Sequence, residues 1–295
     1  MKITWLPNVR PRERRVAVGS FDGVHLGHRE VIRGADSVLT FEPHPVAVVA
    51  PQHTPKLLTP LAVKAELVEQ LGVTELIVIP FDQEFARHSA QEFVDDVLVR
   101  ALGATHVAVG ENFRFGNRAQ GDPQMLQADE RFQTRVVPLL EVKGEIVSSS
   151  HIRGLVLAGE VASAARFLGA PFQLRGEVVS GDRRGRELGF PTANLVPDDA
   201  LVCPGHGVYS CVAETEAGVS AAAVNVGVRP TFVTGRGELV EAYLLDFDGD
   251  LYGTQLRLRF IERLRGERRF SSAEQLIEQM HHDVELTREL AGGAC

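Results

Sequence analysis

The sequence predicts two domains: an α/β domain with a Rossmann-like parallel sheet in residues 1–170, and an antiparallel β-barrel closed by a C-terminal helix in residues 171–295. Up to about residue 170, short apolar runs alternate with helical segments, and this β-α-β-α order is typical of a parallel sheet with helices on both faces. Beyond Pro171 the segments are strand-like and are separated by turns that contain Gly and Asp. The length of 295 residues also favours two cores over one.

The first half contains apolar runs that suit buried parallel strands. These runs are Val16–Val18, Val38–Phe41, Leu76–Ile79 and His106–Val109. Between them, Thr59 is expected to cap a helix that begins at Pro60. Ser89 and Glu92 form the pattern of a capping box, which predicts another helix that reaches Leu102. Ligands of such sheets bind beyond the carboxyl ends of the strands.

The second half begins with two short helical stretches, residues 150–158 and 161–168, and continues with strands. The expected strands are Phe172–Val179, Gly207–Ala213, Ala221–Val226, Leu239–Phe247 and Thr254–Leu264. A final helix is expected to open with a capping box from Ser271 to Glu274. Its apolar face is expected to consist of Leu276, Ile277, Met280 and Val284.

Composition narrows the class of protein. The hydrophobic fraction of 44% and the charged fraction of 24% are ordinary for a globular protein. No apolar run is long enough to span a bilayer, and the N-terminal residues lack the pattern of a secretory signal. The net charge of -8 disfavours a nucleic-acid partner. Three cysteines without metal spacing suggest a reducing cytoplasm.

A glycine-rich stretch with two histidines follows the first predicted strand directly. Gly19 and Gly23 allow the backbone to come close to a ligand, and His25 and His28 face the same side if a helix begins there. Imidazole donors at the start of a helix suit a nucleotide triphosphate, whose adenylyl transfer needs positioning and charge stabilisation. Taken alone, the stretch is equally well explained as a turn with two surface histidines.

The wider pattern resembles the FAD synthetase branch of the nucleotidyltransferases that carry a His-x-Gly-His element. The resemblance extends from Gly19–His28 to Thr40–Pro45, Pro80–Asp82, Gly110–Gly116 and Val147–Arg153. It implies that His25 and His28 are catalytic and that residues 1–170 form an FMN adenylyltransferase domain. The ATP-binding residues that it implies are Gly19, Phe21, Asp22, Gly23, His25, His28, Asn112, Ser149, Ser150 and Arg153.

A second candidate site lies in the barrel half, in residues 181–195. Thr192 and Asn194 alternate along an extended segment, so their oxygens face one side and suit Mg²⁺ bound with a nucleotide. Gly181, Gly185 and Gly189 predict a loop whose amides cover phosphates. Without further context, the stretch reads as a turn and an edge strand.

Here the residues from Gly189 to Asn194 resemble the riboflavin kinase motif, and Val224–Phe232 and Glu241–Gly253 are similar to further kinase segments. The resemblance implies a six-stranded antiparallel barrel with a C-terminal helix, and a riboflavin kinase domain in residues 171–295. It assigns Glu241 as the base for the riboflavin hydroxyl and Thr192 and Asn194 as Mg²⁺ ligands. The ATP- and flavin-binding residues that it implies are Gly181, Gly185, Gly189, Phe190, Pro191, Thr192 and Asn194.

Together the two resemblances imply a cytoplasmic bifunctional enzyme. It phosphorylates riboflavin with ATP, transfers an adenylyl group from ATP to FMN, and releases FAD and diphosphate, with Mg²⁺ as cofactor. Two alternatives remain open. Only 12 residues separate His28 from Phe41, fewer than the family usually carries, which motivates a monofunctional riboflavin kinase with an inactive nucleotidyltransferase-like domain. The other alternative is a flavin-binding module that regulates a partner.

Overall fold

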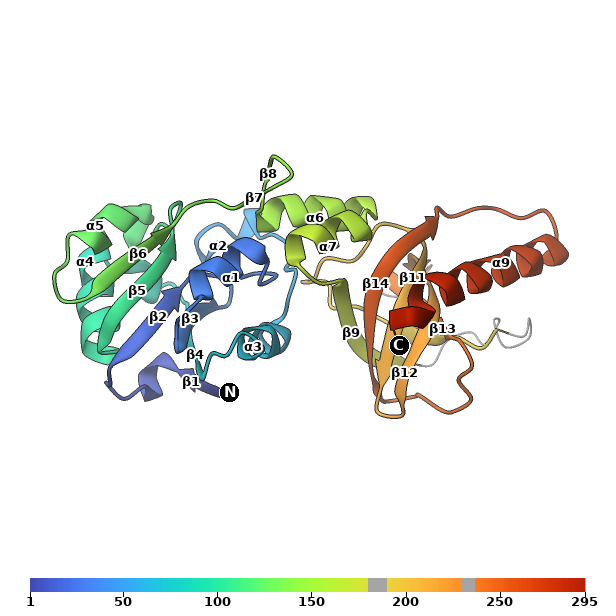
Figure 1. Ribbon diagram of the computed structural model, residues 1–295, viewed down its shortest axis with the longest axis horizontal. Helices are drawn as coiled ribbons and strands as arrows, with labels where there is room; N and C mark the ends of the chain where they lie inside the picture. The colour runs from blue at the N-terminus through green and yellow to red at the C-terminus, as the bar shows by residue number, and fades with distance from the viewer. Residues whose placement is uncertain (180–189, 230–236, 295) are drawn as a thin grey trace. The chain divides into compact units, whose positions relative to one another are not determined.

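The computed structural model describes residues 1–179, 190–229 and 237–294. The chain divides into two compact units, Met1–Ser149 and Ser150–Cys295. Figure 1 shows the first unit as a sheet with helices and the second as a barrel with a long helix. The division precedes the predicted domain boundary at residue 170 by two short helices, and that boundary stays a prediction.

The first unit contains a six-stranded sheet in the order β1-β4-β3-β2-β5-β6, in which every pair of neighbours is parallel. This arrangement confirms the predicted parallel sheet. The strands are β1 (Lys2–Trp5), β2 (Arg14–Val18), β3 (Ser37–Glu42), β4 (Glu75–Pro80), β5 (Ala104–Gly110) and β6 (Gln133–Val137). A small hairpin follows, made of β7 (Glu141–Val142) and β8 (Glu145–Ile146).

Helices cover both faces of this sheet (Figure 1). On one face Phe93 and Leu98 pack against the strands, and on the other Ile32 and Val68 do so. The inner strand β4 is buried on both sides, which explains its uninterrupted apolar run. The helices up to the second unit are α1 (Leu26–Ile32), α2 (Pro45–Val49), α3 (Leu61–Glu69), α4 (Ala90–Glu92), its π-helical continuation η4 (Phe93–Ala101), and α5 (Pro123–Gln127). Short 3-10 turns are η1 (Leu6–Asn8), η2 (Pro51–His53), η3 (Phe85–Arg87) and η5 (Asn117–Ala119).

One predicted helix cap is wrong. Helix α3 begins at Leu61 after Pro60, and no side chain caps it. The hydroxyl of Thr59 instead accepts a hydrogen bond from the backbone N–H of Gly23, at 3.0 Å. Local pattern favoured a cap, but a contact with a distant turn uses the hydroxyl. By contrast, the capping box of Ser89 and Glu92 is present.

The second unit contains a closed antiparallel barrel in the order β10-β13-β12-β11-β14-β9, which confirms the expected six-stranded architecture. Its strands are β9 (Phe172–Val179), β10 (Ala193–Leu195), β11 (Gly207–Thr215), β12 (Gly218–Arg229), β13 (Gly237–Leu244) and β14 (Gln255–Arg265). Its helices are α6 (Ser149–Ala158), whose first residue belongs to the first unit, α7 (Val161–Leu168) and α9 (Ala273–Ala291), followed by η6 (Gly292–Ala294).

Helix α9 is attached to the barrel through polar groups as well as apolar ones. Its most buried residues are Asp283, Thr287 and Ala291, which are spaced by four and so share one face. Arg265 on β14 donates to both carboxylate oxygens of Asp283, at 2.8 to 3.2 Å. The four apolar residues expected to form the packing face are only half-buried. The helix cap is Ser272, one residue later than predicted.

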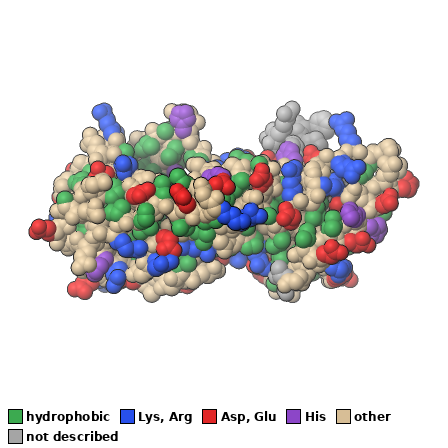
Figure 2. All heavy atoms as spheres, turned by 45° about the horizontal axis from the view of Figure 1, so that its top comes forward, with side chains coloured by type: hydrophobic (Ala, Val, Ile, Leu, Met, Phe, Trp, Pro, Cys, Tyr) green, Lys and Arg blue, Asp and Glu red, His purple; other side chains and the backbone are tan. Residues whose placement is uncertain are grey.

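Acidic and basic side chains are interspersed over the face drawn in Figure 2. In the ranges that the structure describes, no helix combines the length and the apolar character needed to cross a membrane.

A buried carboxylate ties together the amino ends of several strands of the first sheet. Glu75 of β4 is 5% exposed and accepts hydrogen bonds from Thr4, Arg12 and Arg14, at 3.0 to 3.1 Å. Arg14 also donates to the carbonyl of Leu102, which ends the helix of η4. Burial opposes ionisation of Glu75, but the hydrogen bonds from the arginines and Thr4 outweigh it and hold its pKa below the usual value.

Replacing Glu75 by Gln should destabilise the first unit by about 3–5 kcal/mol at neutral pH, because it leaves the buried Arg14 without a counter-charge. The folded-state pKa of Glu75 is lowered, so its contribution is present above the unfolded value of 4.5 and is lost as the pH falls through the folded value. Urea unfolding followed by the fluorescence of Trp5, the single tryptophan and part of β1, measures this unit. The exposed Glu130→Gln variant is the control, and an equal effect of both variants at pH 7 would contradict the prediction.

Candidate functional site

The turn between β2 and α1 is held from behind by one segment of the chain. The buried carboxylate of Asp22 accepts the backbone N–H groups of Leu58 and Thr59, at 2.8 and 3.1 Å. Thr59 in turn accepts from Gly23. Asp22 is 2% exposed, and these hydrogen bonds fix the shape of the turn.

Several residues of this turn have left-handed backbone conformations. Phe21 and Val24 have φ values of 49° and 41°, and Gly23 has a φ of 87°. Left-handed backbone is unfavourable for the first two residue types and persists where the surroundings impose it. At Gly19 a Cβ atom would lie 3.0 Å from the ring of Phe21, so a larger residue here would force that ring to shift. The predicted glycine-rich loop is therefore a tightly specified turn.

The two histidines lie together at the end of this turn. Their rings are stacked with centroids 3.5 Å apart, and the ring of Phe21 meets His28 edge-on. His25 caps α1, because its Nδ1 accepts the backbone N–H of His28 at 3.2 Å. That bond makes Nδ1 an acceptor, so the proton of the neutral ring is on Nε2, where it can be donated to an anion.

Burial keeps both rings neutral. It lowers the pKa of His25 to about 4, with a smaller opposing contribution from a backbone hydrogen bond. The pKa of His28 is lowered well below its usual value by burial first, then by His25 and Lys64. The Nδ1 atom of His28 is buried and has no hydrogen-bond partner among the described residues. An unpartnered buried polar atom of this kind is costly unless a ligand satisfies it.

Beneath the turn lies a buried lysine that the sequence analysis did not single out. Lys64 of α3 is 5% exposed, and its Nζ donates to the carbonyl of Ser20 at 2.7 Å and to the hydroxyl of Thr40 at 3.3 Å. Burial lowers its pKa, while Asp22 and Glu42 oppose that change. The signal in the sequence is a single Lys on the otherwise apolar face of a short helix.

The other residues that the resemblance assigned to ATP are placed as follows. Asn112 is exposed and follows β5, so it lies at the same carboxyl edge of the sheet as the turn after β2. The hydroxyl of Ser149 donates to the carbonyl of Asp22 at 2.9 Å, which brings the start of α6 to the turn. Ser150 and Arg153 follow on α6, in the second unit.

The second candidate site is a row of polar side chains across three neighbouring barrel strands. Asn194 of β10 is paired with Glu241 of β13, and Glu241 is paired with Asn225 of β12. Directly paired residues point to the same face of a sheet, so the three side chains line one face. The amide of Asn225 donates to Glu241 at 3.4 Å. Thr192 directly precedes β10.

The other residues that the resemblance assigned to this site lie outside the polar row. Phe190 is 5% exposed and its ring contacts Tyr243 and His281, so it packs between the barrel and α9. Pro191 is exposed. Gly181, Gly185 and Gly189 lie outside the described residues. Asn225 is the residue that sequence reasoning missed, because its side chain reaches Glu241 only through strand pairing.

Within the described ranges, no group of three or more His, Cys, Asp or Glu side chains could hold a metal ion. The oxygen atoms of Thr192 and Asn194 are nevertheless the ligand type that Mg²⁺ accepts when substrate phosphates and water complete its coordination. The donor set therefore fits Mg²⁺ bound together with a nucleotide and does not fit a site made of protein ligands alone.

Comparisons with known proteins cover both units. The family model for FAD synthetase matches residues 8–151, and the family model for riboflavin kinase matches residues 168–291. The bifunctional riboflavin kinase/FMN adenylyltransferase of Bacillus subtilis (strain 168) is 36% identical over 91% of this chain and 89% of its own. The proteins of the same name from Pseudomonas fluorescens and Escherichia coli (strain K12) are 37% and 35% identical, over 97% and 94% of this chain and 96% and 92% of their own.

The fold is also found in a solved structure. A crystal structure described as a macrolide-efflux protein from Streptococcus pneumoniae is 31% identical and has a TM-score of 0.89. It covers 98% of this chain, and this chain covers 99% of it. The description as a macrolide-efflux protein applies to that protein alone. What the two chains share is the fold.

The histidine pair and the lysine beneath it can be tested by NMR. In the unaltered protein, we expect the ring resonances of His25 to titrate near pH 4 and not near 6.5. Replacing Lys64 by Met should raise the pKa of His28, because it removes a nearby positive charge while preserving the apolar stem. Lys64→Arg is the control that keeps the charge. An unchanged titration of His28 in Lys64→Met would contradict the proposed electrostatic contact.

Proposed function

Because the chain belongs to the bifunctional riboflavin kinase/FMN adenylyltransferase family, with a FAD synthetase domain and a riboflavin kinase domain, we propose that the two sites described above perform the two reactions. The histidine pair and its turn serve adenylyl transfer, and the polar row of the barrel serves phosphorylation of riboflavin. The presence of both domains and the names of the relatives favour the bifunctional enzyme over a monofunctional kinase. They also leave no need for a purely regulatory flavin-binding module.

Adenylyl transfer is the attack of an FMN phosphate oxygen on the α-phosphorus of ATP, with diphosphate as the leaving group. The reaction requires in-line positioning and stabilisation of the charge on the phosphate oxygens. The observation that supports the first site is a pair of stacked, neutral imidazoles at a turn whose Ser20 carbonyl accepts from the buried Lys64. We assign to His25 and His28 the donation of hydrogen bonds to phosphate oxygens, and to Lys64 the support of the turn with a fixed positive charge.

The remaining residues of the first site have supporting roles in this proposal. Gly19 and Gly23 let the backbone approach the nucleotide, and Phe21 and Asp22 hold the turn. Asn112 reaches the nucleotide from the neighbouring strand. Ser149, Ser150 and Arg153 bind phosphate oxygens with hydroxyl and guanidinium donors, a chemistry that suits them. Ser149 already contacts the turn.

Phosphorylation of riboflavin begins when its primary hydroxyl gives its proton to Glu241. The hydroxyl oxygen then attacks the γ-phosphorus of ATP, and ADP leaves. Asn225 donates to Glu241, and this contact orients the carboxylate. The pairing of Asn194 with Glu241 across β10 and β13 supports the proposal, because the amide and the carboxylate are neighbours on two paired strands.

Thr192 and Asn194 would hold Mg²⁺ in the kinase domain. When bound, the ion neutralises phosphate charge and orients the nucleotide. The substrates and products that follow from the two activities are riboflavin, FMN, FAD and ATP. A cytoplasmic location is part of the proposal and is supported by the free thiol of Cys211.

Two substitutions should separate the two activities. We expect His28→Ala to slow FAD formation about 100-fold or more, because it removes a donor to developing charge. Glu241→Gln should slow FMN formation by about 100-fold to 10,000-fold, because it removes a general base. Chromatography of riboflavin, FMN and FAD over time, with ATP and Mg²⁺, measures both reactions.

Each variant is the folding control for the other, since each keeps one activity in the same chain. FMN should appear before FAD in the unaltered enzyme. Normal FAD formation from FMN in His28→Ala would show that the first site is misplaced. Normal FMN formation in Glu241→Gln would show that the base is another residue.

A further inference from the structure

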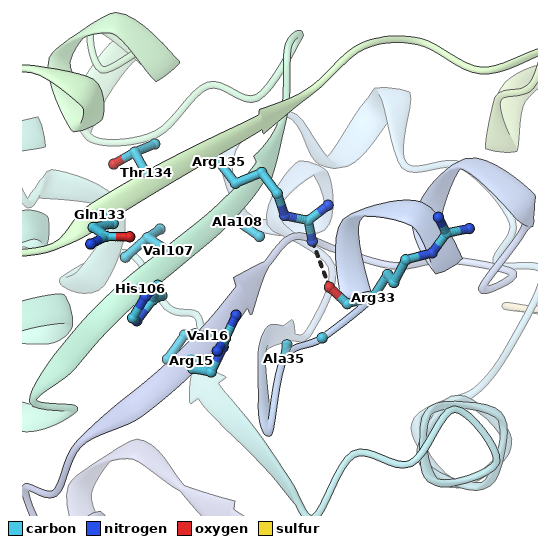
Figure 3. Close-up of a pocket in the computed structure, with 11 residues that line it drawn as sticks. Arg15, Val16, Arg33, Ala35, His106, Val107, Ala108, Gln133, Thr134 and Arg135 are labelled. Carbon is cyan, nitrogen blue, oxygen red and sulfur yellow. Dashed lines mark hydrogen bonds between the residues drawn. The ribbon is translucent and has the colours of Figure 1, made fainter.

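A hollow of about 260 Å³ lies on the first unit, away from the turn that carries the histidines (Figure 3). It is formed where β2, β5 and β6 begin, whereas the turn follows the carboxyl end of β2. Its polar lining consists of Arg15, Arg33, His106, Gln133, Thr134 and Arg135. Neither proposed reaction uses any of these residues.

The hollow exists because α1 is short. Arg15, His106 and Gln133 are partners across β2, β5 and β6, so they form one row on the face that α1 covers. Helix α1 ends at Ile32, and the chain turns away at Gly34, which has a φ of 76°. The row is therefore left open. The face of a parallel sheet is usually apolar, and this row is polar.

Every polar side chain of this lining can donate a hydrogen bond, and the lining contains no carboxylate. Arg15 and Arg135 form no ion pair within the described part of the chain, and Arg33 pairs with Glu30 at the surface. The neighbouring Arg14 is matched to Glu75. The side chain of Arg33 points away from the hollow in Figure 3, so Arg15 and Arg135 supply its guanidinium groups, in a protein whose net charge is -8.

Arg135 is fixed in place by the end of α1. Its guanidinium donates to the carbonyls of Glu30, Val31 and Arg33, at 3.1, 2.8 and 2.7 Å. Figure 3 shows it reaching across the hollow to Arg33. These contacts neutralise the carbonyl groups that would otherwise repel an anion. Because its orientation is set by backbone, Arg135 loses little freedom when a ligand binds.

We propose that this hollow is a second binding site for a small phosphate anion, with inorganic diphosphate as the preferred member of the class. Arginine forks bind phosphate oxygens with two parallel hydrogen bonds, and clustered guanidinium groups favour an ion of multiple charge. The volume lies below the range of about 300–1,000 Å³ that encloses drug-sized ligands, so it suits a ligand smaller than a whole nucleotide or flavin. Adenylyl transfer releases diphosphate, so the enzyme itself supplies the ligand.

The test uses the full-length ¹⁵N-labelled protein and follows backbone amide shifts during addition of sodium diphosphate. We expect saturable shifts at residues 33–35 and 106–108. In Arg15→Gln the dissociation constant should rise about tenfold, since a charged donor is removed. Arg15 is exposed, so the variant should fold normally. Arg87→Gln, with the same change of charge at an exposed position, should bind like the unaltered protein.

Further arms identify the ligand. His28→Ala should leave the shifts at the hollow unchanged, which separates this site from the catalytic turn. Equal shifts with sulfate at the same ionic strength would mean unspecific anion attraction and would overturn the proposal. Shifts with ATP but not with diphosphate would mean a nucleotide site and would also overturn it. So would the absence of saturable shifts up to about 10 mM diphosphate, a concentration well above any specific affinity.

Discussion

The shape of the turn between β2 and α1 depends on side chains far along the chain. The carboxylate of Asp22 accepts two backbone N–H groups 36 and 37 residues away, and Lys64 donates to the carbonyl of Ser20 across 44 residues. These bonds satisfy backbone groups that a buried turn would otherwise leave unpaired. They also hold Phe21 and Val24 in the left-handed conformations that aim the following helix.

That constraint explains the chemistry of the histidine pair. Once the turn is fixed, His25 can only cap α1, and His28 is stacked on it one helical turn later. The burial that results keeps the rings uncharged, and the nearby positive charge is that of Lys64, which supports the turn. In the proposed adenylyl transfer, these neutral donors bind a phosphate group without gaining or losing a proton themselves, so the site is organised before its substrate arrives.

Local pattern was sufficient to predict much of the fold. The apolar runs of the first half predicted a parallel sheet because both of its faces are covered, and spacing alone placed His25 and His28 on one side. The number of strands in the barrel was predicted from the resemblance to riboflavin kinases and not from periodicity. The predicted roles of individual site residues, among them Glu241 and Thr192, remain predictions.

Long-range pairing explains what sequence reasoning missed. Thr59 has the pattern of a helix cap, but a glycine amide 36 residues earlier takes its hydroxyl. Lys64 reads as an interruption of an apolar face until its contacts with Ser20 and Thr40 are seen. Helix α9 was expected to pack through apolar residues, yet its buried face includes Asp283, because Arg265 on β14 supplies the counter-charge. None of these partners can be found within a local window.

The short strand β10 has a consequence for how this enzyme can evolve. All three of its residues pair with β13 and two of them also pair with β9, and Asn194 in the middle is matched to Glu241. Since side chains alternate along a strand, inserting or deleting one residue in β10 would turn Asn194 to the opposite face and bring Ala193 or Leu195 beside the carboxylate. A point substitution near Asn194 can change the activity by a small amount, whereas a change in the length of β10 moves the side chain of Asn194 to the other face in one step. The spacing between Thr192 and Asn194 should therefore be inherited unchanged wherever the kinase activity is kept, even as the residues between and around them drift.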